Sequence, residues 1–197
     1  MGNLLVIDGG RSRCRAAVFT AGGTMSDYGE GPGLPPTSDP DAAAAAAAAA
    51  VALSGAPLVG VEAACAGLAG VLSSSSVASE TARLLSGRLG VERVLVTGDV
   101  VTAHAGALGG QPGVVVVAGT GAVALALSGT GTVARADGCG HLLGDAGSGY
   151  WIGRAGLEAA LRATDGRDGG SLNLARRAEA HLGPLRLLPA RLAASPK

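Results

Sequence analysis

The sequence of 197 residues predicts an α/β fold in which one strand-rich pattern occurs twice. Three observations support this prediction. Short apolar runs end in acids or glycine turns, as buried strands do. Alanine- and leucine-rich stretches with capping residues at their ends lie between these runs, which is typical of helices. After the glycine- and proline-containing segment 108–113, three further strand-like runs follow, so we expect the pattern to restart there.

The first half of the chain is predicted to alternate as β-β-β-α-β-α-β-α. Gly22-Gly23 favours a hairpin between the second and third strands, the alanine run favours a helix, and Gly90 ends another helix. Four prolines and three glycines indicate a loop over 29–40. In chain order we expect strands at 3–8, 14–20 and 24–28, a helix from Asp39 or Asp41 to Leu53, a strand at 58–66, a helix at 76–89, a strand at 92–97 and a helix at 99–108.

The second half is predicted to begin with three strands and to continue as helices. The expected elements are strands at 114–118, 123–127 and 132–136, a glycine-rich loop at 137–149, and helices at 150–163, 171–182 and 184–194. No returning strands follow. Because a three-stranded sheet with open edges is a poor independent unit, either the chain is truncated or a partner completes it. We therefore expect two domains, 1–108 and 109–197, with the second one incomplete.

The composition excludes several classes of protein. Fifteen basic and fifteen acidic side chains give no net charge, whereas a nucleic-acid binder needs a basic patch. Cys14, Cys65 and Cys139 lie far apart, as expected for thiols in a reducing cytosol rather than for disulfides or a zinc site. The longest apolar run, 42–53, is shorter than the roughly 20 residues that cross a bilayer. We expect a cytoplasmic protein that binds neither nucleic acid nor membrane.

Two glycine turns between strands are candidate phosphate sites. In Asp8-Gly-Gly-Arg-Ser-Arg13, consecutive N–H groups together with Ser12 and Arg13 could hold a phosphate, and Asp8 could orient a hydrated magnesium ion. The alternative is an ordinary β-turn with a capping aspartate. Gly119-Thr-Gly121 offers the same donors in the second half, although a short glycine motif alone is a weak signal.

Two acids that follow strands or loops and precede helices are candidate catalytic groups. Asp99 follows a predicted strand, and Asp145 lies in the segment Gly144-Asp-Ala-Gly-Ser-Gly149. An acid at the carboxyl end of a strand is well placed to act as a general base. The alternative for each aspartate is a helix cap.

Histidine and aromatic side chains carry weaker signals. His141 lies in the glycine-rich loop and could line a cleft, whereas His104 is expected to be structural or exposed. Tyr150 and Trp151 are expected to anchor a helix to the core rather than to stack on a sugar.

Taken together and in this order, the motifs resemble the actin-like ATPase superfamily of sugar kinases, and within it the N-acetylglucosamine kinases and the BadF/BadG/BcrA/BcrD ATPase family. The long glycine-rich loop is the most specific part of this resemblance. The segments that carry it are Leu4-Leu-Val-Ile-Asp-Gly-Gly-Arg-Ser-Arg13, Gly67-Leu-Ala-Gly-Val71, Val96-Thr-Gly-Asp99, Val117-Ala-Gly-Thr-Gly121 and Gly138-Cys-Gly-His-Leu-Leu-Gly-Asp-Ala-Gly-Ser-Gly-Tyr-Trp-Ile-Gly153.

The resemblance implies a ribonuclease-H-like fold, duplicated, whose two domains close over ATP and a sugar. It implies ATP and Mg2+ as cofactors, phosphorylation of a hydroxyl on N-acetylglucosamine or a related amino sugar, and a homodimer. The implied roles are general base for Asp99, magnesium binding for Asp8, sugar binding for Asp145, Gly140 and His141, and phosphate binding for Gly9, Gly10, Arg11, Ser12, Arg13, Gly119, Thr120 and Gly121.

The sequence departs from the family pattern at several positions. Ala122 stands where a serine is usual, Gly98 and Leu34 where asparagines are usual, and Cys139 where a tryptophan is usual. The family also continues beyond this chain, and its adenine-binding motif lies in that continuation. Two alternatives follow: a non-catalytic, sugar-binding or truncated member, and an ATPase activator, whose iron–sulfur cluster needs closely placed thiolates.

Overall fold

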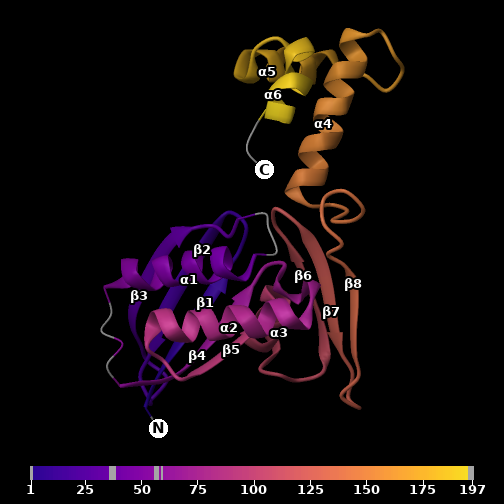
Figure 1. Cartoon of the computed structure of the whole chain (residues 1–197). Helices are drawn as coiled ribbons and strands as arrows, with labels where there is room; N and C mark the ends of the chain where they lie inside the picture. Colours follow the sequence, from indigo (N-terminus) through magenta and orange to yellow (C-terminus); the bar gives the residue numbers. More distant parts are fainter. Residues whose placement is uncertain (1, 36–38, 56–57, 59, 195–197) are drawn as a thin grey trace. The chain divides into compact units, whose positions relative to one another are not determined.

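The computed structural model describes residues 2–35, 39–55, 58 and 60–194 (Figure 1). The chain divides into two compact units, the first comprising Met1–Val117 with Ala124–Ala136 and the second Ala118–Val123 with Asp137–Lys197. The predicted division into domains 1–108 and 109–197 stays a prediction.

The first unit contains a five-stranded sheet with the strand order β3-β2-β1-β4-β5. β1, β2 and β3 pair antiparallel, whereas β4 and β5 run parallel to β1. The carboxyl ends of β1, β4 and β5 therefore meet at one edge of the sheet, where ligands bind in many α/β proteins. The strands are β1 (Asn3–Gly9), β2 (Arg13–Phe19), β3 (Met25–Pro32), β4 (Val61–Leu68) and β5 (Arg93–Thr97).

Two helices, α1 (Pro40–Ser54) and α2 (Ser75–Leu89), cover one face of this sheet (Figure 1). The strands alternate between buried and exposed side chains, so that Leu5 and Ile7 of β1 point into this core while their neighbours point away from it. A short 3-10 helix, Val71–Ser73, leads from β4 toward α2. The predicted mixed α/β order of the first half is confirmed.

The prediction of a loop over 29–40 is wrong for its first four residues, because β3 continues to Pro32. The two strand glycines are needed for close packing against α1 rather than for a turn. A Cβ on Gly29 would lie 2.5 Å from the carbonyl oxygen of Ala50, and one on Gly31 would lie 3.2 Å from the Cα of Ala50. The alanine helix therefore packs directly on the backbone of β3.

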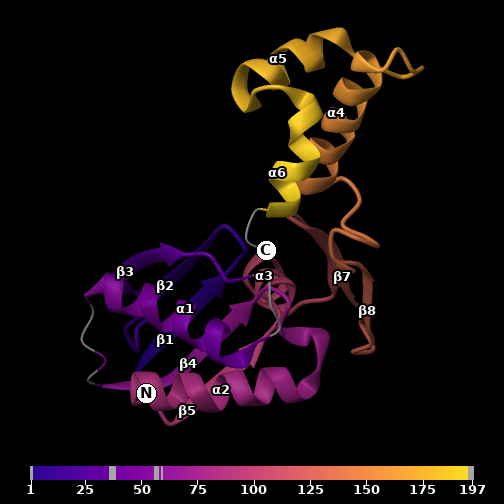
Figure 2. The same cartoon turned by 45° about the horizontal axis from the view of Figure 1, so that its top comes forward.

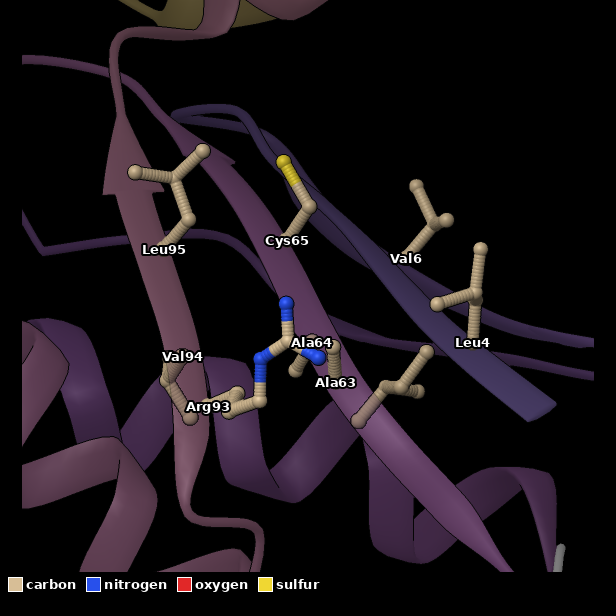
Figure 3. A pocket seen from close by; sticks show the side chains of 9 residues that line it. Leu4, Val6, Ala63, Ala64, Cys65, Arg93, Val94 and Leu95 are labelled. Atoms are coloured by element: carbon tan, nitrogen blue, oxygen red, sulfur yellow. The ribbon is translucent and has the colours of Figure 1, made fainter. Parts of the chain in front are cut away.

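The opposite face of the sheet carries α3 (Asp99–Leu108), whose Thr102 packs on Gly67 of β4. Figure 3 shows Leu4, Val6, Cys65 and Leu95 lining a shallow pocket on β1, β4 and β5. Leu4 is 49% exposed and Leu95 is 61% exposed. This part of the sheet is therefore an apolar surface in contact with solvent.

A second sheet has the strand order β6-β7-β8 and consists of the three strands that the sequence predicts. Short turns join its neighbouring strands, and Gly119 to Gly121 form the first of them. The strands are β6 (Gly113–Ala118), β7 (Ala122–Leu127) and β8 (Val133–Asp137). The incompleteness of a second domain stays a prediction.

The second unit contains the helices α4 (Gly149–Thr164), α5 (Leu172–Leu182) and α6 (Leu188–Ala194). α4 and α5 lie side by side in both views (Figure 1 and Figure 2), and they enclose a small core. The single helix predicted over 184–194 is instead a 3-10 turn followed by α6, because Pro189 has no N–H to donate to the carbonyl of Leu185. No helix within the described ranges is long and apolar enough to span a membrane.

Candidate functional site

The turn between β1 and β2 lies at the carboxyl edge of the first sheet. Its first N–H, that of Gly10, donates to the carbonyl of Arg13 at 2.9 Å, so this donor is used within the turn. The N–H of Leu34 donates to the carbonyl of Gly10 at 2.9 Å. A Cβ on Gly33 would lie 2.5 Å from the carbonyl carbon of Arg11. The start of the proline-rich loop therefore supports the turn from behind.

Leu34 is buried in the core and does not face a ligand. A Cβ on Gly9 would lie 3.2 Å from its Cδ1, so the leucine packs beneath the turn. The position where the family usually has an asparagine is thus a packing position in this chain.

A network of charged side chains covers the exposed face of β1, β2 and β3 beside the turn. Arg15 lies 3.4 Å from Asp8 and 3.6 Å from Glu30, and Arg13 lies 2.9 Å from Glu30. The Tyr28 hydroxyl donates to Glu30 at 3.0 Å and, together with both arginines, lowers the pKa of that carboxyl. Arg13 is therefore held by β3. Solvent screens exposed ion pairs of this kind, so each of them is weak.

Arg11 takes a different direction from Arg13. Its guanidinium donates to the carbonyl of Pro35, and a Cβ on Gly70 would lie 2.5 Å from its Nη2. Gly70 has a φ of 81° and lies in the turn that follows β4. Arg11 thus joins the β1–β2 turn to two further loops at the same edge of the sheet.

Asp99 is the first residue of α3, and Gly98 alone separates it from the end of β5. Its Oδ1 accepts the N–H of Val100 at 2.9 Å, but Gly98 occupies the cap position of α3 and no side chain caps this helix, so the helix-cap alternative for Asp99 is wrong. Burial raises the pKa of the Asp99 carboxyl, the charge of Asp8 raises it further, and Arg11 lowers it. Asp8 near the end of β1, Arg11 in the turn after it and Asp99 just after β5 lie at the same edge of the sheet. A Cβ on Gly98 would lie 2.6 Å from the Cδ1 of Leu72, so a larger residue at that position would have to displace this leucine side chain.

In the second unit, the turn Gly119–Gly121 is bonded to the beginning of α4. The N–H of Gly119 donates to the carbonyl of Gly121, and the N–H of Gly149 donates to the carbonyl of Gly119, each at 2.8 Å. The N–H of Tyr150 donates to the carbonyl of Thr120 at 3.4 Å. A helix N-terminus presents N–H groups and a partial positive charge, which attract anions.

Asp145 lies beside this turn. A Cβ on Gly121 would lie 3.0 Å from the Asp145 Oδ2, so the carboxyl is in contact with the glycine. Asp145 does not cap α4, because the Ser148 Oγ accepts the N–H of Trp151 at 3.1 Å and fills that role. The helix-cap alternative for Asp145 is therefore wrong.

Sequence reasoning missed Asp137, the residue before the glycine-rich loop. Its carboxylate accepts the N–H groups of Asp145 at 2.7 Å and Ala146 at 2.9 Å, and these bonds lower the pKa of the Asp137 carboxyl. An aspartate directly before a glycine-rich loop was the available signal, since its side chain readily bonds to nearby N–H groups.

Gly140 and His141 lie in the same loop. Gly140 has a φ of 81°, and the His141 ring lies 4.8 Å from the ring of Tyr150. Tyr150 is 45% exposed and Trp151 is 51% exposed, so the prediction that they anchor a helix to the core is wrong. α4 packs through its later turns, where Ala160 is buried.

The remaining histidine and cysteine side chains form no metal site in the part of the chain that the structure describes. His104 is buried, with its Nε2 3.2 Å from the carbonyl oxygen of Gly113, which is a structural role. Cys14 lies in the core of the first unit, and burial together with Asp8 raises its pKa to about 11. Cys65 lies on the opposite face of the same sheet, and Cys139 is exposed.

Comparison with known proteins connects this architecture with sugar kinases. An N-acetylmuramic acid/N-acetylglucosamine kinase of Clostridium acetobutylicum is 39% identical over 75 residues, which is 38% of this chain and 24% of that protein. The structure of a provisionally assigned N-acetylglucosamine kinase from Chromobacterium violaceum matches with a TM-score of 0.75 and 26% identity, covering 100% of this chain and 70% of that one.

The fold itself is that of the actin-like ATPases. A ROK family glucokinase from Streptomyces griseus, solved with glucose and AMPPNP, matches with a TM-score of 0.59 and 20% identity over 93% of this chain and 73% of that one. The family model of the BadF/BadG/BcrA/BcrD ATPases matches residues 5–175. The chain belongs to the BadF/BadG/BcrA/BcrD ATPase family.

Proposed function

We propose that this protein transfers a phosphoryl group from ATP to a hydroxyl of N-acetylglucosamine or a related amino sugar. The observation that carries the proposal is the position of Asp99, a half-buried acid at the edge of the sheet where the β1–β2 turn also lies, in a chain whose relatives include amino-sugar kinases.

Asp99 is the proposed general base. A base whose pKa is raised takes a proton from a hydroxyl more readily, and burial raises the pKa of Asp99. Arg11 opposes this effect and lowers the pKa of the carboxyl. The short bond from Val100 holds one carboxylate oxygen in place, which orients the other.

The two glycine turns are the proposed phosphate sites, one formed by residues 9–13 and the other by residues 119–121. Phosphoryl transfer depends mainly on positioning and on neutralising negative charge, and the helix α4 places its N-terminus at the second turn. Asp8 supplies an exposed carboxylate, and Mg2+ commonly binds one or two carboxylates together with nucleotide phosphates. When bound there, the ion would neutralise charge on the transferred group.

The glycine-rich loop is the proposed sugar site. Asp145 supplies a carboxylate that can accept hydrogen bonds from two hydroxyls, and Gly140 and His141 lie in the same loop. The contact of the Asp145 carboxyl with Gly121 supports this proposal, because the proposed sugar-binding group then lies beside the proposed second phosphate site.

The test is an ADP-release assay with magnesium-ATP and a panel of hexoses, N-acetylhexosamines and N-acetylmuramic acid. Sugar-dependent release should fall by about 10²–10⁴-fold in Asp99→Asn, because a positioned general base contributes about that much. Nucleotide binding, measured by calorimetry, should survive. The matched control is Asp168→Asn, a change at an exposed loop residue. Release that persists in Asp99→Asn would refute the role of the base.

A non-catalytic sugar-binding protein is the second candidate, because the second glycine turn is followed by Ala122, where the family usually has a serine hydroxyl. Sugar binding without release of ADP would favour it. An activator with an iron–sulfur cluster is disfavoured, since Cys14 and Cys65 point to opposite faces of one sheet.

A further inference from the structure

The glycine-rich loop is held at two places that are far apart in the sequence. At its end, the N–H of Gly149 donates to the carbonyl of Gly119. At its beginning, the N–H of Gly138 donates to the carbonyl of Ala122 at 2.9 Å. Between these anchors, the backbone around Asp145 has one further partner in β8, the carboxylate of Asp137.

The Asp137 carboxylate binds this segment with both oxygens. Oδ1 accepts the N–H of Asp145 at 2.7 Å and that of Cys139 at 3.4 Å, and Oδ2 accepts the N–H of Ala146 at 2.9 Å. Hydrogen bonds to an ionised acceptor are stronger than those between neutral groups. The Asp137 side chain therefore ties the beginning of the loop, at Cys139, to the segment at Asp145 and Ala146.

Two residues of this loop adopt an unfavourable left-handed backbone conformation in the structure that contains these hydrogen bonds. Asp137 has a φ of 61° and Asp145 a φ of 60°, values that are uncommon outside glycine. They are the two non-glycine residues with positive φ in the described parts of the chain. Gly144 leaves room for the carboxylate, because a Cβ there would overlap its Oδ1 and lie 2.8 Å from the Cβ of Cys139.

We infer that Asp137 is a positioning residue, which holds the backbone of Asp145 so that the Asp145 carboxyl stays in contact with the Gly119–Gly121 turn. The inference deepens the proposed function, in which Asp145 binds the sugar. In this role Asp137 acts through its hydrogen bonds to the backbone of the loop.

The first test measures the loop directly, by hydrogen exchange of the backbone amides in the full chain. Asp137→Gly keeps the left-handed backbone and removes both acceptors. Protection of the Asp145 and Ala146 amides should fall about tenfold or more, because bonds to a charged acceptor are lost. Asp137→Asn keeps one acceptor oxygen and should lose less. Asp168→Asn is the control and should leave both amides unchanged.

The second test separates positioning from general destabilisation. Asp137→Gly should raise the KM for the sugar about tenfold and leave the KM for ATP within about twofold, with Asp137→Asn in between. Unchanged amide protection in Asp137→Gly would overturn the inference, as would an equal rise of both KM values. An inactive wild type would refute the proposed function, while the exchange comparison would still decide the role of Asp137.

Discussion

Replacing Gly67 with alanine should displace the helix that carries Asp99. The added Cβ would lie 2.8 Å from the Cγ2 and 2.9 Å from the Cβ of Thr102. Carbon atoms in contact lie about 3.5 Å apart or more, so β4 and α3 must separate by about 0.6 Å, because no rotation of the threonine side chain moves its Cβ. Overpacking of this kind costs about 1–3 kcal/mol of unfolding free energy.

The displacement also has a catalytic consequence. Asp99 lies three residues before Thr102 on the same helix, and the Thr102 hydroxyl donates to the Asp99 carbonyl at 2.9 Å. Misplacement of a reacting group by about 1 Å can cost about 10²-fold in rate. Gly67→Ala should therefore lower kcat for the sugar by about tenfold to a hundredfold.

Urea unfolding followed by circular dichroism measures the stability of Gly67→Ala, Thr102→Ala and the double variant. Thr102→Ala removes Oγ1 and Cγ2, two of the three Thr102 atoms that the new Cβ approaches, and keeps the third, Cβ. The clash is therefore partly relieved, and the loss of unfolding free energy in the double variant should be smaller than the sum of the two single losses. Gly87→Ala is the matched control, because it lies in open space on α2 and should gain about 1 kcal/mol. Additive single changes, or a Gly67→Ala variant within about 0.5 kcal/mol of wild type, would refute the steric reasoning.

Three further predictions concern single side chains. The pKa of Asp99 is raised in the folded state, so the unfolding free energy of the wild type falls as the pH rises from the ordinary aspartate pKa to the raised one. Asp99→Asn removes this charge and should therefore unfold at a higher temperature than the wild type at neutral pH, but not in acid. Thermal unfolding scans at several pH values measure the difference. Ser148→Ala removes the cap of α4 and should cost about 1 kcal/mol, measured by the fluorescence of Trp151 during urea unfolding. At pH about 8, a disulfide reagent should modify the exposed Cys139 at once. Cys14 is buried and has a pKa of about 11, so it should react only after unfolding in urea. Rapid modification of Cys14 in the folded protein would contradict its burial.

The elements that sequence reasoning predicted well are those set by local signals. Gly90 and Gly109 end helices in the left-handed conformation, as glycines do, and the Gly119–Gly121 turn separates two strands. Asp99 was predictable as a candidate because the end of a strand and the start of a helix are both local features.

The features that it missed depend on contacts between distant segments. The register of β2 and β3 brings Glu30 beside Arg13 and Arg15. The glycines around Glu30 indicate a loop in the sequence, whereas in the fold they allow this strand to pack closely against α1. The Asp137 carboxylate accepts the N–H of Asp145, which lies eight positions later in the chain. Trp151 was expected to be buried because large aromatic side chains usually are, but burial is decided by tertiary packing.

The run of nine alanines in α1, Ala42 to Ala50, makes this helix unusually tolerant of changes in its length. An inserted residue rotates the rest of a helix by about 100°, which normally moves its apolar stripe off the core. Here each rotated position within the run again presents a methyl group to the sheet. The rotation of α1 about its axis is therefore fixed by contacts at its two ends. Asp41 pairs with Arg88 of α2 at the beginning, and Val51 is buried near the end. A run of identical small residues can thus lengthen or shorten during evolution while the sheet beneath it stays covered.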